Sequence, residues 1–516
     1  MRLRVRTYTG TYMRTVAALA VGGVLLTGCS AGSGSRSADQ RASGGIRHAA
    51  PDGGGRTPDP GQAEGETDGA KRTAPPADYL STFALDVDTA SYGFARRTIG
   101  SGRLPDPETV RPEEFVNSFR QDYRSPDGNG FSVTVDGART GADGWSLMRV
   151  GLTTRAPAAD SVRKPAALTF VVDISGSMAE PGRLDLVRTS MELMADRLRD
   201  DDSIALVTFS DKAKTRIPMT RLGGNREHVH EVISGLRPDS STNVEAGVTR
   251  GYEEAVKGLR EGATNRVVVL SDGLANSGDT SADGILERVE KARKDKGITL
   301  FGVGVGSDYG DRLMETLADR GDGHTVYVSD PEQARKVFCD DLPAQIDLRA
   351  RDAKAQVAFD PQTVESFRLI GYENRRVADQ DFRNDAVDGG EVGPGHSVTA
   401  LYAVRTRPGA AGHVATATVR WLDPATRAPH EESASVEAAA LTGRAWTEAD
   451  ARFQVTAVAA YFASALRERG GGWEPVPGAL PLDRLAERAA TVADLTEDAD
   501  VRGLADTVRQ ASRLMG

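Results

Sequence analysis

The sequence is poor in cysteine and, after its first 28 residues, has no apolar run of membrane-spanning length. Cys29 and Cys339 are the two cysteines among 516 residues, so a framework of disulfide bonds is excluded and stability has to come from a hydrophobic core. Cys339 lies in a helix-like run, and we predict that it is a small buried residue rather than a nucleophile.

The chain also has fewer basic than acidic residues. The chain has 64 Lys and Arg against 74 Asp and Glu, which gives a formal net charge of −10. Nucleic-acid binding depends on clusters of Lys and Arg that contact phosphates. The acidic balance therefore argues against nucleic acid as a partner.

The first 28 residues have the pattern of a lipoprotein signal peptide. Four arginines flank or precede an apolar stretch, Ala17–Leu26, which is too short to span a bilayer comfortably. It ends in Leu26-Thr27-Gly28-Cys29, which resembles a bacterial lipobox, whose Cys is diacylated and becomes the new N-terminus. We expect lipidation of Cys29 and an anchor on the extracytoplasmic face of the cell membrane. The alternative is an ordinary signal peptide with a chance Cys.

Residues 29–78 are expected to form a flexible tether. Ser30–Pro76 is rich in Gly, Ser, Pro, Asp and Arg and has almost no large apolar residue. Such a segment cannot bury enough surface to offset the entropy lost on ordering.

Residues 163–347 alternate strands and helices. Apolar runs such as Ala167–Val172 and Arg266–Leu270 predict buried strands, and Arg183–Arg199 has apolar residues three and four apart, as in an amphipathic helix. This order indicates a mostly parallel sheet with helices on both faces, a Rossmann-like α/β domain. The other expected strands are Ile204–Phe209, Ile298–Val305 and Thr325–Val328, and the other expected helices are Glu245–Leu259, Ala282–Lys294, Arg312–Ala318 and Pro331–Asp341.

The flanks, residues 79–162 and 348–445, are expected to be rich in β-strands. In His413–Trp421, for example, apolar and polar residues alternate. The simplest arrangement is one β-sandwich into which the α/β domain is inserted, although two separate β units also fit. The other expected strands are Phe83–Val87, Phe131–Val135, Leu147–Thr153, Ala355–Phe359, Phe367–Ile370, Val398–Thr406 and Ser433–Ala438.

The C-terminal residues 446–516 are predicted to be helical. Thr447-Glu-Ala-Asp450 resembles a capping box that opens a helix ending at Arg469. Two further helices are expected over Leu482–Val492 and Ala499–Leu514.

Three polar loops follow or precede these elements. Asp173, Ser175 and Ser177 come directly after the first apolar strand of the α/β domain, Thr242 lies in a loop before a helix, and Asp272 ends another strand. Ligands of open α/β sheets bind at the carboxyl ends of strands, near a topological switch point. We therefore expect these side chains to converge.

The combination resembles the metal-ion-dependent adhesion site of von Willebrand factor A domains. The resemblance assigns Asp173, Ser175, Ser177, Thr242 and Asp272 as the metal-site residues. It implies that the two Ser hydroxyls touch the ion directly, that the Thr coordinates it in the ligand-competent state, and that the Asp residues act directly or through water. It also implies a protein ligand that offers an Asp or Glu carboxylate to the ion.

The chemistry of these residues agrees with a magnesium site. Mg²⁺ prefers about six oxygen ligands in octahedral geometry and gives up water reluctantly. Only the two Asp side chains are ionised, so a bound ion keeps charge for an outside carboxylate. Mn²⁺ and Ca²⁺ are alternatives, as is an A domain whose site holds no metal.

The resemblance extends beyond the A domain. Phe83–Tyr92, Val110–Phe115, Gly371–Arg375 and Gly395–Tyr402 are similar to the flanking modules of a bacterial family of A-domain lipoproteins, and the match runs from about Tyr79 to near the end. The segment Ser241-Thr-Asn-Val244-Glu245 departs from that family's more Gly-rich version. The match implies an architecture more than a biological process.

Two motifs have competing interpretations. Asp86, Asp88 and Ser91 could mark a second cation site or a phosphatase-like motif, but Ala90 stands where the latter wants Thr or Val, so a structural turn is favoured. The Gly-x-Gly-x-Gly run Gly302–Gly306 resembles a dinucleotide loop. It lies in a predicted strand, which favours tight packing.

Taken together, the sequence predicts a membrane-anchored extracytoplasmic lipoprotein that is not an enzyme and binds protein ligands through a cation, for adhesion or complex assembly. One alternative is a scaffolding envelope protein with a non-essential metal. The other is a metal-dependent hydrolase, which would need a general base or nucleophile, and no His lies in the three loops.

Overall fold

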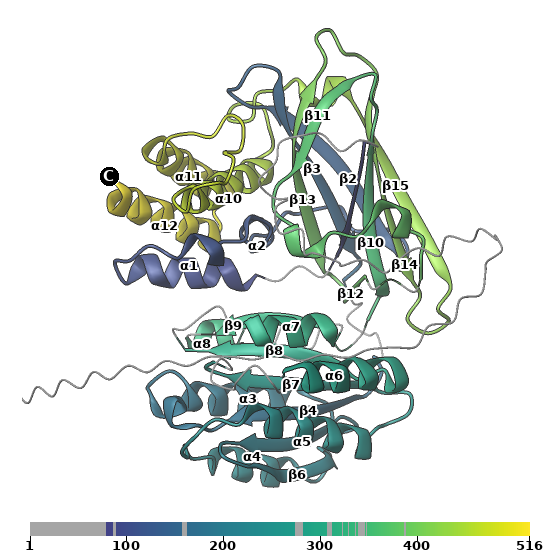
Figure 1. Ribbon diagram of the computed structural model, residues 1–516, viewed down its shortest axis with the longest axis vertical. Helices are drawn as coiled ribbons and strands as arrows, with labels where there is room; N and C mark the ends of the chain where they lie inside the picture. The colour runs from purple at the N-terminus through teal and green to yellow at the C-terminus, as the bar shows by residue number, and fades with distance from the viewer. Residues whose placement is uncertain are drawn as a thin grey trace, which may run out of the picture. The chain divides into compact units, whose positions relative to one another are not determined.

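The computed structural model describes residues 79–85, 89–156, 163–273, 282–306, 312–321, 323–328, 330–335, 337–338, 346, 348–385, 387 and 389–516. The signal peptide, the tether, Cys29 and Cys339, and the Asp86 and Asp88 of the alternative motif lie outside these residues. The described part contains an α/β domain, two antiparallel sheets and a group of helices (Figure 1). None of its helices has the length and apolar character needed to cross a membrane.

The α/β domain has the expected mostly parallel sheet, in the order β6-β5-β4-β7-β8-β9, with β6 antiparallel to β5. Successive strands lie to either side of β4, so the winding reverses between β4 and β7 and creates a switch point there. The strands are β4 (Ala166–Asp173), β5 (Ser203–Phe209), β6 (Ala213–Arg221), β7 (Thr264–Ser271), β8 (Thr299–Val305) and β9 (His324–Val328).

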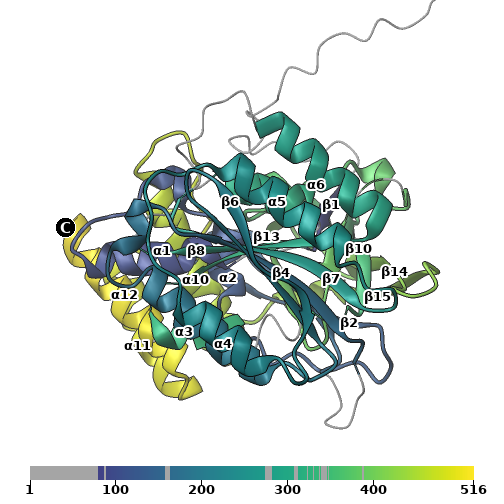
Figure 2. The ribbon, with the colours of Figure 1, turned by 90° about the horizontal axis from the view of Figure 1, so that it is seen from below.

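Helices cover both faces of this sheet. In Figure 2, α3 and α4 lie on one side and α5 and α6 on the other, and each set shares a hydrophobic cluster with the sheet face beneath it. The sequence did not predict β6 or α4. In β6 only one side chain, Ile217, is buried, so the strand has no apolar run that would indicate it. The helices are α3 (Leu184–Arg197), α4 (Arg226–Ser234), α5 (Val244–Lys257), α6 (Ala282–Lys296), α7 (Arg312–Arg320) and α8 (Pro331–Arg335).

Two glycines allow α5 to lie very close to the sheet. A Cβ atom at Gly251 would be 2.2 Å from Cγ2 of Val171 in β4, and one at Gly247 would be 2.6 Å from the ring of Phe209 in β5. The close approach fixes the start of α5, and the loop before it, beside the carboxyl ends of β4 and β5.

The Gly302–Gly306 run is used for packing, as expected. Within β8, a Cβ atom at Gly302 would be 2.9 Å from the Met314 side chain, and one at Gly304 would be 2.7 Å from the Tyr327 ring. Residues with side chains would push α7 or β9 away from the sheet.

The flanking strands form two sheets, each built from segments on both sides of the α/β domain. One has the order β1-β10-β14-β15, with β12 also paired to β10, and the other β11-β13-β3-β2. This mixing confirms the insertion and excludes two separate β units. The strands are β1 (Leu80–Ala84), β2 (Phe131–Arg139), β3 (Trp145–Thr154), β10 (Ala350–Phe359), β11 (Val364–Leu369), β12 (Gly390–Val392), β13 (Ser397–Thr406), β14 (His413–Leu422) and β15 (Pro429–Glu437).

The predicted strand Phe83–Val87 was wrong in its bounds, because β1 ends at Ala84 and Leu85 lies in a bend. The N-terminal flank also contains two helices that the sequence reading missed, α1 (Ala90–Gly100) and α2 (Pro112–Asn117). Their buried side chains join the core of the C-terminal helices. Those helices are α10 (Ala451–Glu468), α11 (Leu482–Thr496) and α12 (Ala499–Met515).

The cap of α10 also differs from the expectation. Asp450 is the N-cap residue, and its carboxylate accepts hydrogen bonds from the backbone N–H groups of Arg452 (2.8 Å) and Phe453 (3.3 Å). Thr447 precedes it in a turn. The predicted Thr447 capping box was therefore three residues too early.

Ser91 has a structural role at the start of α1. Its backbone N–H donates to Glu114 Oε2 (2.8 Å), and its hydroxyl donates to the Thr109 carbonyl (2.7 Å) and accepts from the Arg111 N–H (2.9 Å). These bonds join the first two family-like motifs to each other, so Ser91 has a structural role, but it lies in a helix and the predicted turn was wrong at this residue.

The entry and exit of the α/β domain meet at Thr264, the first residue of β7. The Thr264 N–H donates to the carbonyl of Pro165, just before β4 (2.9 Å), and its hydroxyl donates to the carbonyl of Ile346 (2.5 Å). The two crossings between the domain and the sandwich are therefore side by side.

Replacing Gly251 by Ala should destabilise the protein. The new methyl group would overlap Val171, an overpacking cost of about 1–3 kcal/mol. Gly503→Ala is the control, because its Cβ would meet only ordinary contacts inside α12 and Ala is favoured over Gly in helices by up to about 1 kcal/mol. Calorimetric melting should show a lower Tm for G251A and an equal or higher Tm for G503A; equal shifts would contradict the close packing.

Candidate metal centre

Asp173 is the last residue of β4 and is fully buried. Its Oδ1 accepts the backbone N–H of Ser175 (2.8 Å), and its Oδ2 accepts the hydroxyl of Ser271 at the end of neighbouring β7 (2.7 Å). Burial raises the pKa of the Asp173 carboxyl to about 6, despite these bonds. The carboxylate therefore lies at the switch point in an environment where a positive ion would stabilise its charge.

Ser175, Ser177 and Asp272 form a continuous hydrogen-bonded group beside it. The hydroxyls of Ser175 and Ser177 are 3.1 Å apart, and the Ser177 hydroxyl donates to Asp272 Oδ1 at 2.9 Å. The structure thus brings four of the five predicted residues together from two strands that are far apart in sequence.

The spacing of these oxygens suits a small hard cation. Mg²⁺ binds oxygen at roughly 2.0–2.1 Å, which places neighbouring ligands of an octahedron about 2.9 Å apart. The separations of 3.1 Å between Ser175 and Ser177 and of 2.9 Å between Ser177 and Asp272 are close to that edge. The two carboxylates and two hydroxyls of the cluster are thus a donor set that fits a hard divalent cation such as Mg²⁺ or Mn²⁺.

Thr242 lies in the adjoining loop and does not contact the other four by a hydrogen bond in the described part of the chain. Its loop is held to the same sheet edge, because the Asp239 N–H donates to the Ile174 carbonyl (2.6 Å) and the Asn243 N–H donates to the Ser210 carbonyl (2.7 Å). Asn243 then caps α5 through its side chain. Thr242 is thus a neighbour of the cluster, and its role as a ligand stays a prediction.

The same loop contains an acid that the sequence reading passed over. Asp239 accepts the Ser240 N–H (2.8 Å) and the Ser210 hydroxyl (3.1 Å), and these bonds hold the pKa of Asp239 below its usual value. Asp239 stands three residues before the predicted site residue Thr242, so its position in the same loop was a usable signal.

Two further residues of the site were missed. Ser271, which orients Asp173, stands directly before Asp272 in the same motif, so its position was a usable signal. Arg183 was read only as the start of a helix, yet its buried guanidinium bonds Oδ2 of Asp272. Spacing in the sequence gives no hint of that burial.

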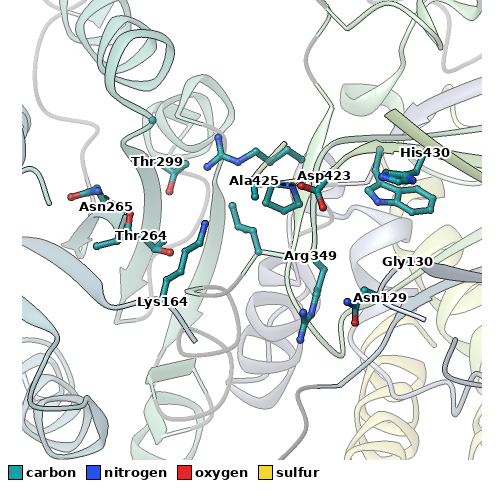
Figure 3. A pocket seen from close by; sticks show the side chains of 16 residues that line it. Asn129, Gly130, Lys164, Thr264, Asn265, Thr299, Arg349, Asp423, Ala425 and His430 are labelled. Atoms are coloured by element: carbon teal, nitrogen blue, oxygen red, sulfur yellow. Dashed lines mark hydrogen bonds between the residues drawn. The ribbon is translucent and has the colours of Figure 1, made fainter. Parts of the chain in front are cut away.

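The described residues contain no group of three or more His, Cys, Asp and Glu side chains placed to hold a metal, and the candidate site itself has only two such side chains, Asp173 and Asp272. A hollow of about 450 Å³ lies at the opposite edge of the sheet, where β7 and β8 begin. Figure 3 shows Lys164, Thr264 and Thr299 on one side of it and Asp423 and His430 on the other.

The polar groups of this hollow are largely used within the protein. Thr299 Oγ1 accepts from Arg266 Nε (2.9 Å), and Asp423 Oδ1 accepts the N–H groups of Ala425 (2.9 Å) and Thr426 (2.7 Å). The hollow is a junction of the inserted domain with the sandwich, remote from Asp173 along the strands. The carboxyl edge is the better candidate for a functional site.

Residues 167–339 match the family described as "von Willebrand factor type A domain". The chain carries a von Willebrand factor A domain. The flanks of this A domain also match family models: residues 347–474 match "Uncharacterized protein YfbK, C-terminal", and residues 65–146 match "von Willebrand factor". The expected flanking modules are therefore present on both sides of the A domain.

Individual relatives agree with this assignment. The chain is 36% identical over 335 residues to "Uncharacterized protein YfbK" of Escherichia coli (strain K12), covering 63% of this chain and 57% of the relative. It is 28% identical over 192 residues to "Uncharacterized protein sll0103" of Synechocystis sp. (strain ATCC 27184 / PCC 6803 / Kazusa), covering 37% of this chain and 44% of the relative. It thus spans less than two thirds of either relative.

Among solved structures, "von Willebrand factor type A from Catenulispora acidiphila" aligns with a TM-score of 0.47 at 15% identity, covering 75% of this chain and 91% of that one.

Ser271→Ala should weaken cation binding at this site by about tenfold, because groups that orient metal ligands typically contribute 10–100-fold to affinity. The variant loses the hydrogen bond to Asp173 Oδ2 and keeps all five predicted site residues. Ser234→Ala, at the exposed end of α4, is the matched control. Calorimetric titration with Mn²⁺ checks the expectation, and equal affinities of the two variants would contradict it.

Proposed function

We propose that the chain is a membrane-anchored extracytoplasmic lipoprotein whose A domain binds protein ligands through a divalent cation, in adhesion or complex assembly. An A domain by itself indicates a role in protein interaction or adhesion. The observation that supports the finer proposal is the cluster of Asp173, Ser175, Ser177 and Asp272 oxygens at the switch point, with separations near an Mg²⁺ octahedron.

The residues that would hold the ion are Asp173, Ser175, Ser177, Thr242 and Asp272. A bound Mg²⁺ or Mn²⁺ supplies an electrophilic centre for a carboxylate from outside. The chain's own groups bind and orient: Ser271 and the Ser175 N–H fix the Asp173 carboxylate, while the Ser177 hydroxyl fixes Oδ1 of Asp272. The natural occupant of the remaining position is an Asp or Glu side chain of a partner protein.

The surroundings of the cluster favour binding over hydrolysis. Its described hydrogen-bond partners are Ser271, Arg183 and backbone groups, none of which is a ready general base at neutral pH. A scaffolding role with a dispensable metal differs from the proposal in one measurable respect, which is whether partner capture needs the ion.

Anchoring rests on the sequence of the N-terminus, where Cys29 follows a short apolar run. A lipid on Cys29 and the long polar segment up to residue 78 would let the A domain reach outward from the membrane surface. A partner on the same envelope or on a neighbouring cell then comes within range.

Asp173→Ala should abolish binding of Mg²⁺ and Mn²⁺, since Asp173 is a buried acid bonded only by neutral groups, whereas the carboxylate of Asp272 is already paired with Arg183. Isothermal titration of the full chain with each ion measures this. The control is Asp196→Ala, an exposed acid on α3 that pairs with His230. No heat with the wild-type chain would rule out a cation-dependent function.

Capture of envelope proteins should require the ion. A pull-down with Mg²⁺ is compared with one in chelator and with one using Asp173→Ala, and each captured protein is retested after replacement of its exposed Asp and Glu residues. Capture that occurs with Mg²⁺ but is lost in chelator, with D173A and after replacement of the partner's acids supports carboxylate recognition. Capture that survives chelator and D173A would favour the scaffold.

Cys29→Ser should release the protein from the membrane fraction and abolish incorporation of an alkyne-tagged palmitate. Cys339→Ser, the control, keeps the lipobox and should leave both readouts unchanged. Label retained by C29S, or membrane association that does not depend on Cys29, would contradict a lipid anchor.

A further inference from the structure

Arg183 places a fixed positive charge against the candidate metal site. Its side chain is only 8% exposed, and its Nη1 bonds Oδ2 of Asp272 and donates to the Ser177 carbonyl (3.1 Å). Its Nη2 lies 2.8 Å from Oε2 of Glu180, a largely exposed acid. One buried guanidinium therefore connects both residues of the Ser177–Asp272 pair.

The position of Arg183 is built by a second, independent element. Gly306 directly follows β8 and ends the Gly-x-Gly-x-Gly run with φ +96°, and a Cβ atom there would lie 2.9 Å from Nε and 3.2 Å from Cγ of Arg183. The missing side chain of Gly306 leaves the room in which the arginine stem lies. The guanidinium is thus held by packing as well as by its ion pairs.

Both carboxylate oxygens of Asp272 are therefore already bonded within the protein. Its Oδ1 accepts from Ser177, while its Oδ2 is paired with Arg183. A fixed monovalent cation next to a ligand set opposes the binding of a second cation, and the effect is strong at buried positions, where the effective dielectric constant is low. Only Asp173 then offers a carboxylate that is not already paired with a positive side chain.

We propose that Arg183 is a positioning residue that neutralises Asp272, lowers the site's intrinsic affinity for its cation and so leaves a bound cation more attractive to a carboxylate from outside. The proposal rests on the cation-dependent function given above. Arg183 would thus weaken binding of the cation and strengthen binding of the protein ligand to the cation. If Arg183 only held Asp272 in place, its replacement would have the opposite effect, because Asp272 would become less ordered and the affinity for the cation would fall.

The first test is the affinity for Mg²⁺ alone, measured by isothermal titration on the full chain. Arg183→Gln, which removes the charge and keeps hydrogen-bonding groups, should bind Mg²⁺ at least tenfold more tightly than wild type. Arg183→Lys, which keeps the charge, should stay within about threefold of wild type, as judged from the charge alone. Arg188→Gln removes an equal charge from α3, where the side chain bonds the Leu236 carbonyl, and should change nothing.

The second test measures the cation's attraction for carboxylates. Acetate is titrated into the Mn²⁺-loaded protein, and displacement of exchanging water is followed by water-proton relaxation. R183Q should need at least severalfold more acetate than wild type. If the arginine were purely structural, its replacement would not both raise the affinity for the ion and lower the affinity for acetate.

Glu180→Gln keeps the test open if R183Q fails to fold. Glu180 is exposed and bonds Arg183 from the outer side, so its neutralisation strengthens the effective positive charge of the arginine and should weaken Mg²⁺ binding severalfold. Weaker or unchanged binding by folded R183Q, or unchanged binding by E180Q, overturns the role of Arg183. If the wild-type chain binds no Mg²⁺, the proposed function itself fails, which is a separate result.

Discussion

The organising constraint of this protein is a carboxylate held away from water at the end of the central strand of a parallel sheet. Asp173 is fully buried, and an ionised group there is costly unless hydrogen bonds or a positive charge compensate for the lost hydration. The Ser175 N–H and the Ser271 hydroxyl supply part of that compensation. The switch point and the close approach of α5 determine which loops can supply the rest.

The fold was largely readable from the sequence where packing is regular. Strands such as β4 and β7 are buried on both faces, so they appear as continuous apolar runs. The elements that were missed lack this signal: β6 is an edge strand with one buried residue, and α1 is a short helix whose motif was taken for a turn. The insertion could be suspected from strands on both sides, but it is the pairing of β1 with β10 and of β3 with β13 that excludes two separate β units.

The candidate site was only partly predictable from the sequence. Asp173, Ser175, Ser177 and Asp272 were found because acids and hydroxyls at strand ends must meet at one edge. Thr242 was placed in the correct loop, but its contact with the others was not shown. Asp239 lies in the same loop as Thr242 and could have been considered with it. Arg183 could not be found, because its position depends on the space beside Gly306, which is a property of the folded domain rather than of any local pattern.

The meeting of both domain crossings at Thr264 has a mechanical consequence. Pro165 and Ile346 are bonded to the same residue, on the edge of the sheet opposite Asp173. A pull applied to a ligand at the carboxyl edge would therefore pass down the sheet and leave through two adjacent chain segments that share the load.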